Sequence, residues 1–306
     1  MAVPTRTSNR RKVAAAASLD CATAFQTMAL DCVAAIKAHH SSACAGDAEA
    51  VHQIRIAITR LRAAVAFFAP IVVDEEWVRL KKEIAWLNGS LGAARDSDVL
   101  VEYARRKRYR AWAQRMIGEQ LDQRQMRNHR QLVRALRSVR TQHLISAMAG
   151  WIRRGPWLAR CQQRKDAEAL QIYCARKLNR WHGRLVRQGR QLNTLGASRR
   201  HRLRIKFKRF RYMLEALTET VNLWGRRELR HLHQPAKQLQ RALGDLRDIK
   251  SFASLAGDGP QAKKGKTSKK RPPGYRRRKE KLLGAALASH RDMAKSFRGS
   301  VLQNST

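Results

Sequence analysis

Acidic residues are scarce in this sequence. Its 306 residues include 64 lysines and arginines but only 23 aspartates and glutamates, which leaves a formal net charge of +41. Repulsion at this level opposes folding unless a polyanion neutralises the surface. A disordered basic tail is excluded as the source of the charge, because 43% of the residues are hydrophobic, close to the globular average. We therefore expect a folded protein whose partner is a large polyanion.

Paired cysteines and long apolar runs are also lacking. The five cysteines are an odd number without a C-x-x-C pair or tight spacing to histidines, which argues against a disulfide framework and a zinc site and favours a reducing cytosol. The apolar stretch Val13 to Ala17 is too short for a signal peptide. No run of 18 apolar residues occurs, so we expect no membrane-spanning helix. These absences predict a cytoplasmic protein without a metal or other cofactor.

Strand signals are nearly absent as well. Alternating β-branched residues are rare, and Ala, Leu, Arg, Gln and Lys fill most segments, which predicts an all-α fold. Proline and glycine mark the expected helix breaks at Ala69-Pro70, Gly118, Gly150 to Pro156, Gly196, Gly225 and Gly257 to Pro260. The predicted parts are a basic N-terminal tail (1–18), a first helical half (19–150), a second helical half (151–256), a basic mobile loop (257–279) and a C-terminal helix that completes the second half (280–300).

The cations are segregated as well as abundant. Three stretches without any acidic residue, 123–165, 169–214 and 261–279, hold 35 of the 64 lysines and arginines. A run of mixed charge ordinarily indicates a solvated helix face. Because these runs lack counter-ions, they indicate a binding surface instead.

An internal repeat is the most specific signal in the sequence. The segment His52 to Arg62 aligns with His201 to Arg211 at an offset of 149 residues, with five identities in eleven positions. Further along, Leu91 to Asp96 aligns with Leu243 to Asp248 at an offset of 152, with four identities in six. Two matches in the same order and at nearly the same offset predict an internal duplication.

On a helical wheel, each copy of the first motif separates into an apolar face and a cationic face. The apolar faces, which we expect in the core, are Ile54, Ile58, Leu61, Val65 and Phe68 in one copy and Leu203, Phe207, Phe210, Leu214 and Leu217 in the other. The opposite faces carry His52, Arg55, Thr59 and Arg62, and His201, Arg204, Lys208 and Arg211. Each motif spans roughly 15 Å of helix, a strip of cations several phosphates long. Arginine suits phosphate because its planar fork bonds two oxygens.

Two features of these motifs admit more than one interpretation. The repeated histidines are either structural hydrogen bonders or ligands of the anion, which would favour their protonated form. The acidic residues of Gly92 to Asp98 form either a metal site or helix caps. The second interpretation has Gly92 and Gly244 ending one helix and aspartates capping the next, a duplicated helix–turn–helix joint. We prefer it because the second copy has a lysine where the first has Asp98.

The motifs occur in a characteristic order. They are His52-x-x-Arg55 through Arg60-x-Arg62, Leu91-Gly92 to Arg95-Asp96-x-Asp98, His201-x-x-Arg204 to Lys208-Arg209-x-Arg211-Tyr212 with Glu215, and Leu243-Gly244-Asp245. Over about residues 19–256, this order resembles the CHAD domain, the conserved-histidine α-helical domain. The resemblance implies two pseudo-symmetric helical bundles flanking a basic central channel. It also implies binding of inorganic polyphosphate and association with polyphosphate granules.

The resemblance also implies which residues bind the ligand. Carried over position by position, they are His52, Arg55, Arg62, His201, Arg204, Lys208 and Arg211, with Arg60, Arg209 and Lys237 as neighbours. The sequence departs from the family pattern at Thr59, where a cation is usual, and at Arg247, where the second repeat often has asparagine. The E-x-E-x-K strand of the triphosphate-tunnel domain that many relatives carry does not occur.

Three classes of function compete. Non-catalytic binding of polyphosphate is the leading hypothesis, and a nucleic-acid or nucleoid-binding helical protein is the alternative. The seven tryptophans are scattered rather than interleaved with the cations, so we expect them in cores rather than stacked on bases, and helix-turn-helix, zinc-finger and RNP signatures are missing. An enzyme is disfavoured because the acid-free strips lack carboxylates to hold Mg²⁺ near phosphates, and no Walker loop, catalytic triad or H-E-x-x-H motif occurs.

Overall fold

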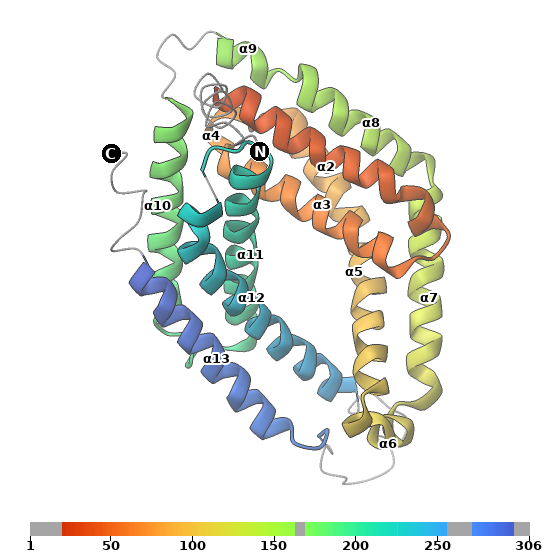
Figure 1. The fold of residues 1–306 in the computed structure, drawn as a ribbon. Coiled ribbons are helices and arrows are strands. Elements are labelled where there is room, and N and C mark those ends of the chain that lie inside the picture. The colour runs from red at the N-terminus through yellow and green to blue at the C-terminus, as the bar shows by residue number, and fades with distance from the viewer. Residues whose placement is uncertain (1–19, 163–168, 225, 256–270, 297–306) are drawn as a thin grey trace, which may run out of the picture.

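A computed structural model describes residues 20–162, 169–224, 226–255 and 271–296, and every regular element in these ranges is a helix (Figure 1). The earlier helices are α2 (Cys21–Cys44), α3 (Ala48–Phe67), α4 (Ala69–Val72), α5 (Glu75–Arg105), α6 (Lys107–Met116), α7 (Gly118–Arg137), α8 (Val139–Arg154) and α9 (Trp157–Gln162). The later helices are α10 (Leu170–Gly189), α11 (Ala197–Glu219), α12 (Arg226–Leu255) and α13 (Tyr275–Lys295). The all-α prediction is confirmed. Within the described ranges, none of these helices is at once long and apolar enough to traverse a lipid bilayer.

Aspartates set the start of three of the helices. Asp20 caps α2, Asp47 caps α3 and Asp74 caps α5, and each carboxylate accepts a first-turn backbone N–H at 2.7–2.9 Å. Such a cap satisfies one of the N–H groups that a helix leaves unpaired at its start. Asp74 also accepts the indole N–H of Trp151 at 3.1 Å, so the cap of α5 ties this helix to α8.

The main core contains both predicted apolar stripes. All ten of their side chains are buried, with exposed fractions of 0–3%. The stripe on α3 and the stripe on α11 belong to one continuous core, together with residues of α2, α5, α8, α10 and α12. The apolar face of each repeated helix is therefore turned inward, and its opposite face is left for polar contacts.

The tryptophans also pack in the interior, as the sequence predicts. Trp77, Trp151, Trp157 and Trp224 are buried, and Trp86, Trp112 and Trp181 are half-buried against the cores. Their packing contributes to the cores of a chain whose surface charge opposes compaction.

A second, smaller core joins the two parts of the chain at the opposite end of the molecule. The ring of Phe252 on α12 lies between Tyr103 on α5 and Tyr109 and Trp112 on α6, with ring centroids 5.0–5.7 Å apart. Leu282 of α13 belongs to the same cluster. The early helices thus contact the late helices through the main core, where α3 lies against α11, and also through this second core.

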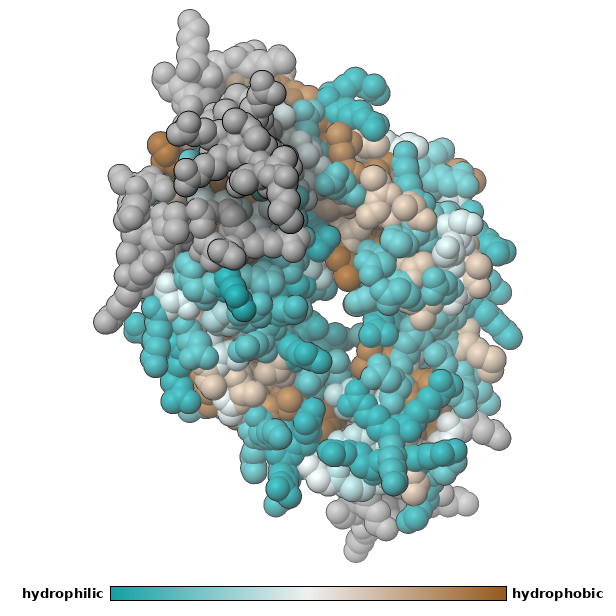
Figure 2. Space-filling view, viewed as in Figure 1, coloured by the Kyte–Doolittle hydropathy of each residue, from teal (hydrophilic) through white to brown (hydrophobic). Residues whose placement is uncertain are grey.

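An opening lies between these two contacts. Figure 2 shows it near the centre of the molecule, rimmed by hydrophilic residues. In Figure 1 the helices around this position are α3, α5, α11 and α12. These are the four helices that carry the repeated motifs.

The structure corrects several predicted boundaries. The predicted break at Gly150 to Pro156 occurs at the end of that range, because α8 continues through Gly150 to Arg154, so the predicted division at residue 150 falls inside this helix. Buried residues at helical spacing on both sides of Gly150 outweigh its weak helix propensity. The breaks at Pro70, Gly118, Gly155 and Gly196 are confirmed.

The predicted basic loop (257–279) ends too late. Its last residues, 275–279, form the first turn of α13, which therefore begins before residue 280. Gly274 adopts a left-handed backbone conformation (φ +67°) directly before the helix, and the Tyr275 N–H donates to the Pro272 carbonyl. The tail 1–18, the breaks at Gly225 and at 257–260, the rest of the loop up to residue 270 and residues 297–300 lie outside the described residues.

Candidate anion-binding site

The polar faces of α3 and α11 meet at one repeat position. The Lys208 ammonium donates to the Thr59 hydroxyl oxygen at 3.3 Å, and the two residues are separated by the repeat offset of 149. The Thr59 hydroxyl donates its own proton to the Arg55 carbonyl oxygen at 2.8 Å, so its free lone pair faces the ammonium. The two cationic strips are thereby brought together.

Two arginines of the strips lie against glycines of the neighbouring helices. A Cβ added to Gly92 on α5 would lie 3.3 Å from Nη1 of Arg55. A Cβ added to Gly244 on α12 would lie 3.3 Å from Nε of Arg204. The missing side chains let each guanidinium pack directly on a helix backbone. The same contact is made in both repeats.

This arrangement overturns the predicted helix–turn–helix joints. Gly92 and Asp96 lie inside α5, and Gly244 and Asp248 lie inside α12, both of which run without a break. Glycine is used here for close approach of a side chain and not to end a helix. The aspartates one turn later therefore cap nothing.

The aspartates instead lie beside the strips as counter-charges. Asp96 accepts a hydrogen bond from Arg247 of α12 at 2.5 Å, which links α5 to α12. The charges of Asp96 and Asp248 favour the protonated form of the strip arginines. Burial raises the pKa of Asp248, against the effect of Arg204 and Arg247.

Four nitrogens on the strips are buried without a hydrogen-bond partner in the described part of the chain. They are His52 Nδ1, Arg55 Nη1, His201 Nδ1 and Arg204 Nε. Buried polar atoms are nearly always paired, since an unpaired one loses its hydration without compensation. The four atoms come from two positions, each repeated in both copies. An anion would satisfy the arginine nitrogens, and it would also satisfy each histidine Nδ1 when that nitrogen carries a proton.

The strips are also electrostatically unfavourable in the absence of an anion. Burial together with neighbouring cations lowers the pKa of His52, Arg55, His201 and Arg204. Burial and the charges of the surrounding arginines lower the pKa of Lys208 to about 7. A bound polyanion would raise the pKa of these groups, because it pairs with their charged forms.

One carboxylate, that of Glu215, organises the far end of the strip on α11. It accepts a short hydrogen bond from Arg211, one turn earlier on the same helix. It also accepts from His233 of α12 at 2.9 Å and from Arg60 of α3 at 3.4 Å. Burial alone would raise the pKa of Glu215, but these hydrogen bonds and charges lower it overall. Arg211 is further held by Gln240, whose side-chain oxygen accepts from Nε at 2.8 Å.

Residues 27–256, three quarters of the chain, match the family described as the CHAD domain. The chain belongs to the CHAD family. The crystal structure of the CHAD domain from the plant Ricinus communis is similar to this chain, with a TM-score of 0.69, 22% sequence identity and coverage of 90% of this chain and 93% of that one. PptA from Streptomyces chartreusis is similar with a TM-score of 0.56, 16% identity and coverage of 91% and 98%. No curated protein matches the sequence. At these identities the two structures establish the fold.

Within this CHAD domain, the structure brings together most of the predicted site residues. The residues held between α3, α5, α11 and α12 are His52, Arg55, His201, Arg204, Lys208 and Arg211. The departure from the CHAD pattern at position 59 is explained by the same geometry. A cation in place of Thr59 would put like charge beside Lys208.

Arg60 and Lys237 lie apart from the centre of the CHAD strips. Arg60 is exposed, pairs with Glu215, and lines a small cavity of about 110 Å³ beside α2. Lys237 is exposed on α12, at helical spacing between His233 and Gln240. It therefore lies on the face of α12 that contacts α11.

In the repeat, Arg62 corresponds to Arg211, and Arg209 corresponds to Arg60. Glu215 binds Arg211 and Arg60, whereas the described residues show no carboxylate bound to Arg62 and Arg209. The charge of Arg62, added to burial, lowers the pKa of Arg209. The residue that matches Glu215 in the first repeat is Ala66. Arg209 also lines a cavity of about 280 Å³ with Trp181 and cations of α10 and α11. Among the described residues, a carboxylate thus neutralises one end of the CHAD site and none is seen to neutralise the other.

Several residues of the CHAD site were not predicted from the sequence. They are Glu215, which was seen only as part of the family motif, and His233, Gln240 and Arg247. The spacing of Arg211 and Glu215, four residues apart on one helix, was a usable signal for their ion pair. The contributions from α12 depend on how it packs against α11 and α5, and no local pattern indicates them.

Proposed function

We propose that this CHAD protein binds inorganic polyphosphate, without cleaving it, on the facing strips of α3 and α11. Through that binding it would associate with polyphosphate granules in the cytoplasm. The CHAD family's association with polyphosphate supports this ligand class, and the excess of 64 lysines and arginines over 23 acidic residues supports a polyanion.

The observation that carries the proposal is the repetition of unpartnered nitrogens. Each strip offers a histidine and an arginine nitrogen at matching positions, buried and unpaired within the described residues. A ligand that satisfies both strips in the same way must present the same acceptor group at successive points along its length. Polyphosphate does so with identical phosphoryl oxygens. Guanidinium groups bind such oxygens through charge-assisted hydrogen bonds.

The chemistry of the site favours binding over hydrolysis. Two carboxylates beside the strips are already engaged by cations, Asp96 by Arg247 and Glu215 by Arg211, His233 and Arg60. In the residues described, no cluster of three or more His, Cys, Asp or Glu side chains is suited to a metal ion. Phosphoryl transfer usually relies on carboxylate-held Mg²⁺ to neutralise charge. Release of orthophosphate with Mg²⁺ or Mn²⁺, lost in R204A, would contradict the non-catalytic assignment.

Substitution of the strip arginines tests the binding proposal. The variant R55A/R62A/R204A/R211A removes four cations from the site. Its matched control, R124A/R127A/R130A/R134A, removes four exposed arginines from α7. We expect the strip variant to lose at least about 100-fold in affinity for long-chain polyphosphate, since each charged hydrogen bond contributes roughly 1.5–3 kcal/mol. The control should lose far less, and equal losses would refute the assignment to the strips.

Competition with DNA separates polyphosphate from nucleic acid. The alternative function rests on net charge, and charge alone does not select between two phosphate chains. We expect unlabelled polyphosphate to displace labelled polyphosphate far better than duplex DNA does, at equal phosphate concentration and matched salt. If DNA competes equally well, the protein is a general polyanion binder.

A further inference from the structure

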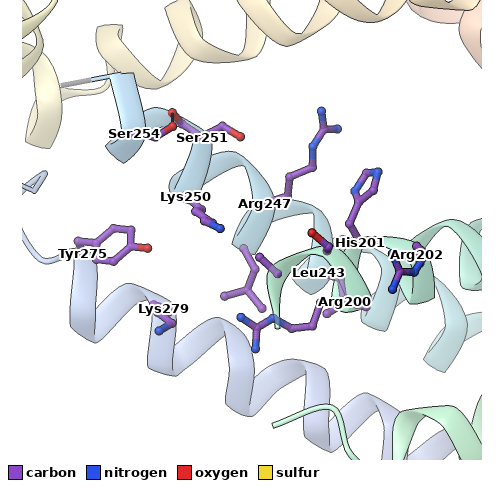
Figure 3. Close-up of a pocket in the computed structure, with 13 residues that line it drawn as sticks. Arg200, His201, Arg202, Leu243, Arg247, Lys250, Ser251, Ser254, Tyr275 and Lys279 are labelled. Atoms are coloured by element: carbon purple, nitrogen blue, oxygen red, sulfur yellow. Dashed lines mark hydrogen bonds between the residues drawn. The ribbon is translucent and has the colours of Figure 1, made fainter. Parts of the chain in front are cut away.

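A cationic cavity beside the strips lies where the start of α11 meets α12 and α13 (Figure 3). Its volume is about 420 Å³. Leu243 and Leu246 of α12 contribute an apolar wall, and Tyr275 at the start of α13 closes one side. Among the described lining residues, His201 alone belongs to the predicted binding residues.

Cations from three helices converge on this cavity. Figure 3 shows Arg200 of α11, Lys250 of α12 and Lys279 of α13 around the space between α12 and α13. None of the thirteen described lining residues is acidic. The hydroxyl groups of Ser251 and Tyr275 add hydrogen-bond donors. A multiply charged anion with oxygen acceptors is the ligand that this lining fits.

The start of α11 adds to the positive potential of the cavity. This 23-residue helix follows Gly196, and no side chain in the described part of the chain caps its first N–H groups. The lining includes Ala197 and Ser198 of the first turn. Unpaired N–H groups and the helix dipole favour an anion at this end. The Nδ1 of His201, one turn further along, is buried without a hydrogen-bond partner among the described residues, and when it carries a proton it would donate to an acceptor at the same end of α11.

The cavity is continuous with the strips through two shared residues. His201 begins the strip on α11 and also lines the cavity. Arg247 lines the cavity too, and its hydrogen bond to Asp96 places it between α12 and α5. The charge of Arg247 lowers the pKa of both His201 and Arg55, so its guanidinium lies close to the strips as well.

We propose that this cavity is an exit subsite, in which a polyphosphate chain held on the strips continues past His201 and Arg247 and places its following phosphates on Arg200, Lys250 and Lys279. This inference rests on the proposed function. It adds a prediction about chain length. A chain that fills only the strips gains nothing from the cavity, whereas a longer chain does.

The experiment compares three variants with the wild type over a size-fractionated ladder of inorganic polyphosphate, from tripolyphosphate to long chains. The cavity variant is R200A/K250A/K279A. The charge-matched control is R127A/R130A/R134A on the exposed face of α7, and the strip control is R55A/R204A. Binding is measured at several salt concentrations. Circular dichroism checks that each variant is folded.

We expect the cavity variant to bind tripolyphosphate like the wild type and long chains about 10-fold more weakly, as three partly exposed charges allow. The slope of log affinity against log salt concentration, measured on long chains, should become shallower by about 2, if each phosphate contact contributes roughly 0.7 as on single strands.

An equal loss of affinity at every chain length, or a loss no larger than that of the α7 control, would overturn the exit subsite. Tripolyphosphate binding lost in the cavity variant but kept in R55A/R204A would instead reveal a separate small-anion site and overturn the continuity. If R55A/R204A binds long chains normally, the proposed function itself fails.

Discussion

Arg204 rests on Gly244, so closely that a Cβ on this glycine would lie 3.3 Å from the guanidinium Nε. Arg55 lies on Gly92 at the same distance. A contact this tight requires the neighbouring group to move when a methyl group is added. The glycines therefore control where the two strip arginines point, although neither glycine can contact a ligand through a side chain.

Alanine at these glycines should separate stability from binding. Both lie inside helices, where Gly→Ala ordinarily stabilises by about 1 kcal/mol. We expect G92A and G244A to keep or slightly raise the free energy of unfolding and to lower polyphosphate affinity, because each arginine is displaced. G89A is the matched control, since a Cβ at this exposed position of α5 meets no atom within 4 Å. Unchanged affinity in both variants would show that the contact does not position the arginines.

Lys208 should couple polyphosphate binding to proton uptake. Its pKa is about 7 in the ligand-free protein, and a bound polyanion raises this value. We expect affinity to fall as the pH rises through about 7 and above, and calorimetry in buffers of different ionisation enthalpy to register protons taken up on binding. The variant K208R, which stays charged, should lose much of the pH dependence, and K206R at an exposed position should keep it.

Lys208 should also make the stability of the ligand-free protein depend on pH. Stability should rise with pH, whereas polyphosphate affinity should fall. The unfolded chain has the ordinary lysine pKa of 10.5, so between pH 7 and 10.5 it binds more protons at Lys208 than the folded protein does. The free energy of unfolding therefore gains from this residue as the pH rises through that window. Denaturant titrations of the wild type and K208R, compared over this range, should differ in slope. Parallel curves would contradict the lowered pKa.

Glu215 should contribute to stability at neutral pH and lose that contribution in acid. Its pKa is lower in the folded protein than the ordinary 4.5, so the contribution is complete above about 4.5 and disappears as the pH falls through the folded value. We expect E215Q to reduce the free energy of unfolding at pH 7 by about 1–3 kcal/mol, because Arg211 and His233 lose a charged acceptor. The difference from the wild type should shrink as the pH falls below 4.5 and vanish once the pH is below the lowered pKa of the folded protein. E280Q, at an exposed position of α13, should show little effect at either pH.

The unneutralised end of the site predicts an inhibitory substitution. Ala66 occupies the repeat position of Glu215, one turn after Arg62, whose charge acts on Arg209. The variant A66E would supply the carboxylate that this end lacks, and a neutralised pair of arginines attracts phosphate less. We expect A66E to weaken polyphosphate binding about 10-fold relative to A66Q, which has nearly the same shape without the charge. Equal binding by the two variants would mean that Arg62 and Arg209 do not face the ligand.

Much of the fold could be predicted because the signals for it are local. Two apolar stripes follow helical periodicity and are buried as predicted. One runs from Ile54 on α3 to Phe68 at its C-cap, and the other runs from Leu203 to Leu217 on α11. The role of Gly92 could not be predicted in this way. In a sequence, glycine at a helix end and glycine beneath an approaching side chain look alike, and only the path of α5 distinguishes them.

The sequence by itself determined an all-helical CHAD chain with two cationic helix faces, since amphipathic spacing depends only on residues three and four apart. Only the tertiary structure decided which cations meet. The crossing of α3 and α11 pairs Lys208 with Thr59, and the packing of α12 gives Arg211 its partners on one side and brings Lys250 beside Arg200 on the other. Two charges far apart in the sequence interact strongly only when the fold brings them within a few ångströms of each other. The packing of the helices sets these distances.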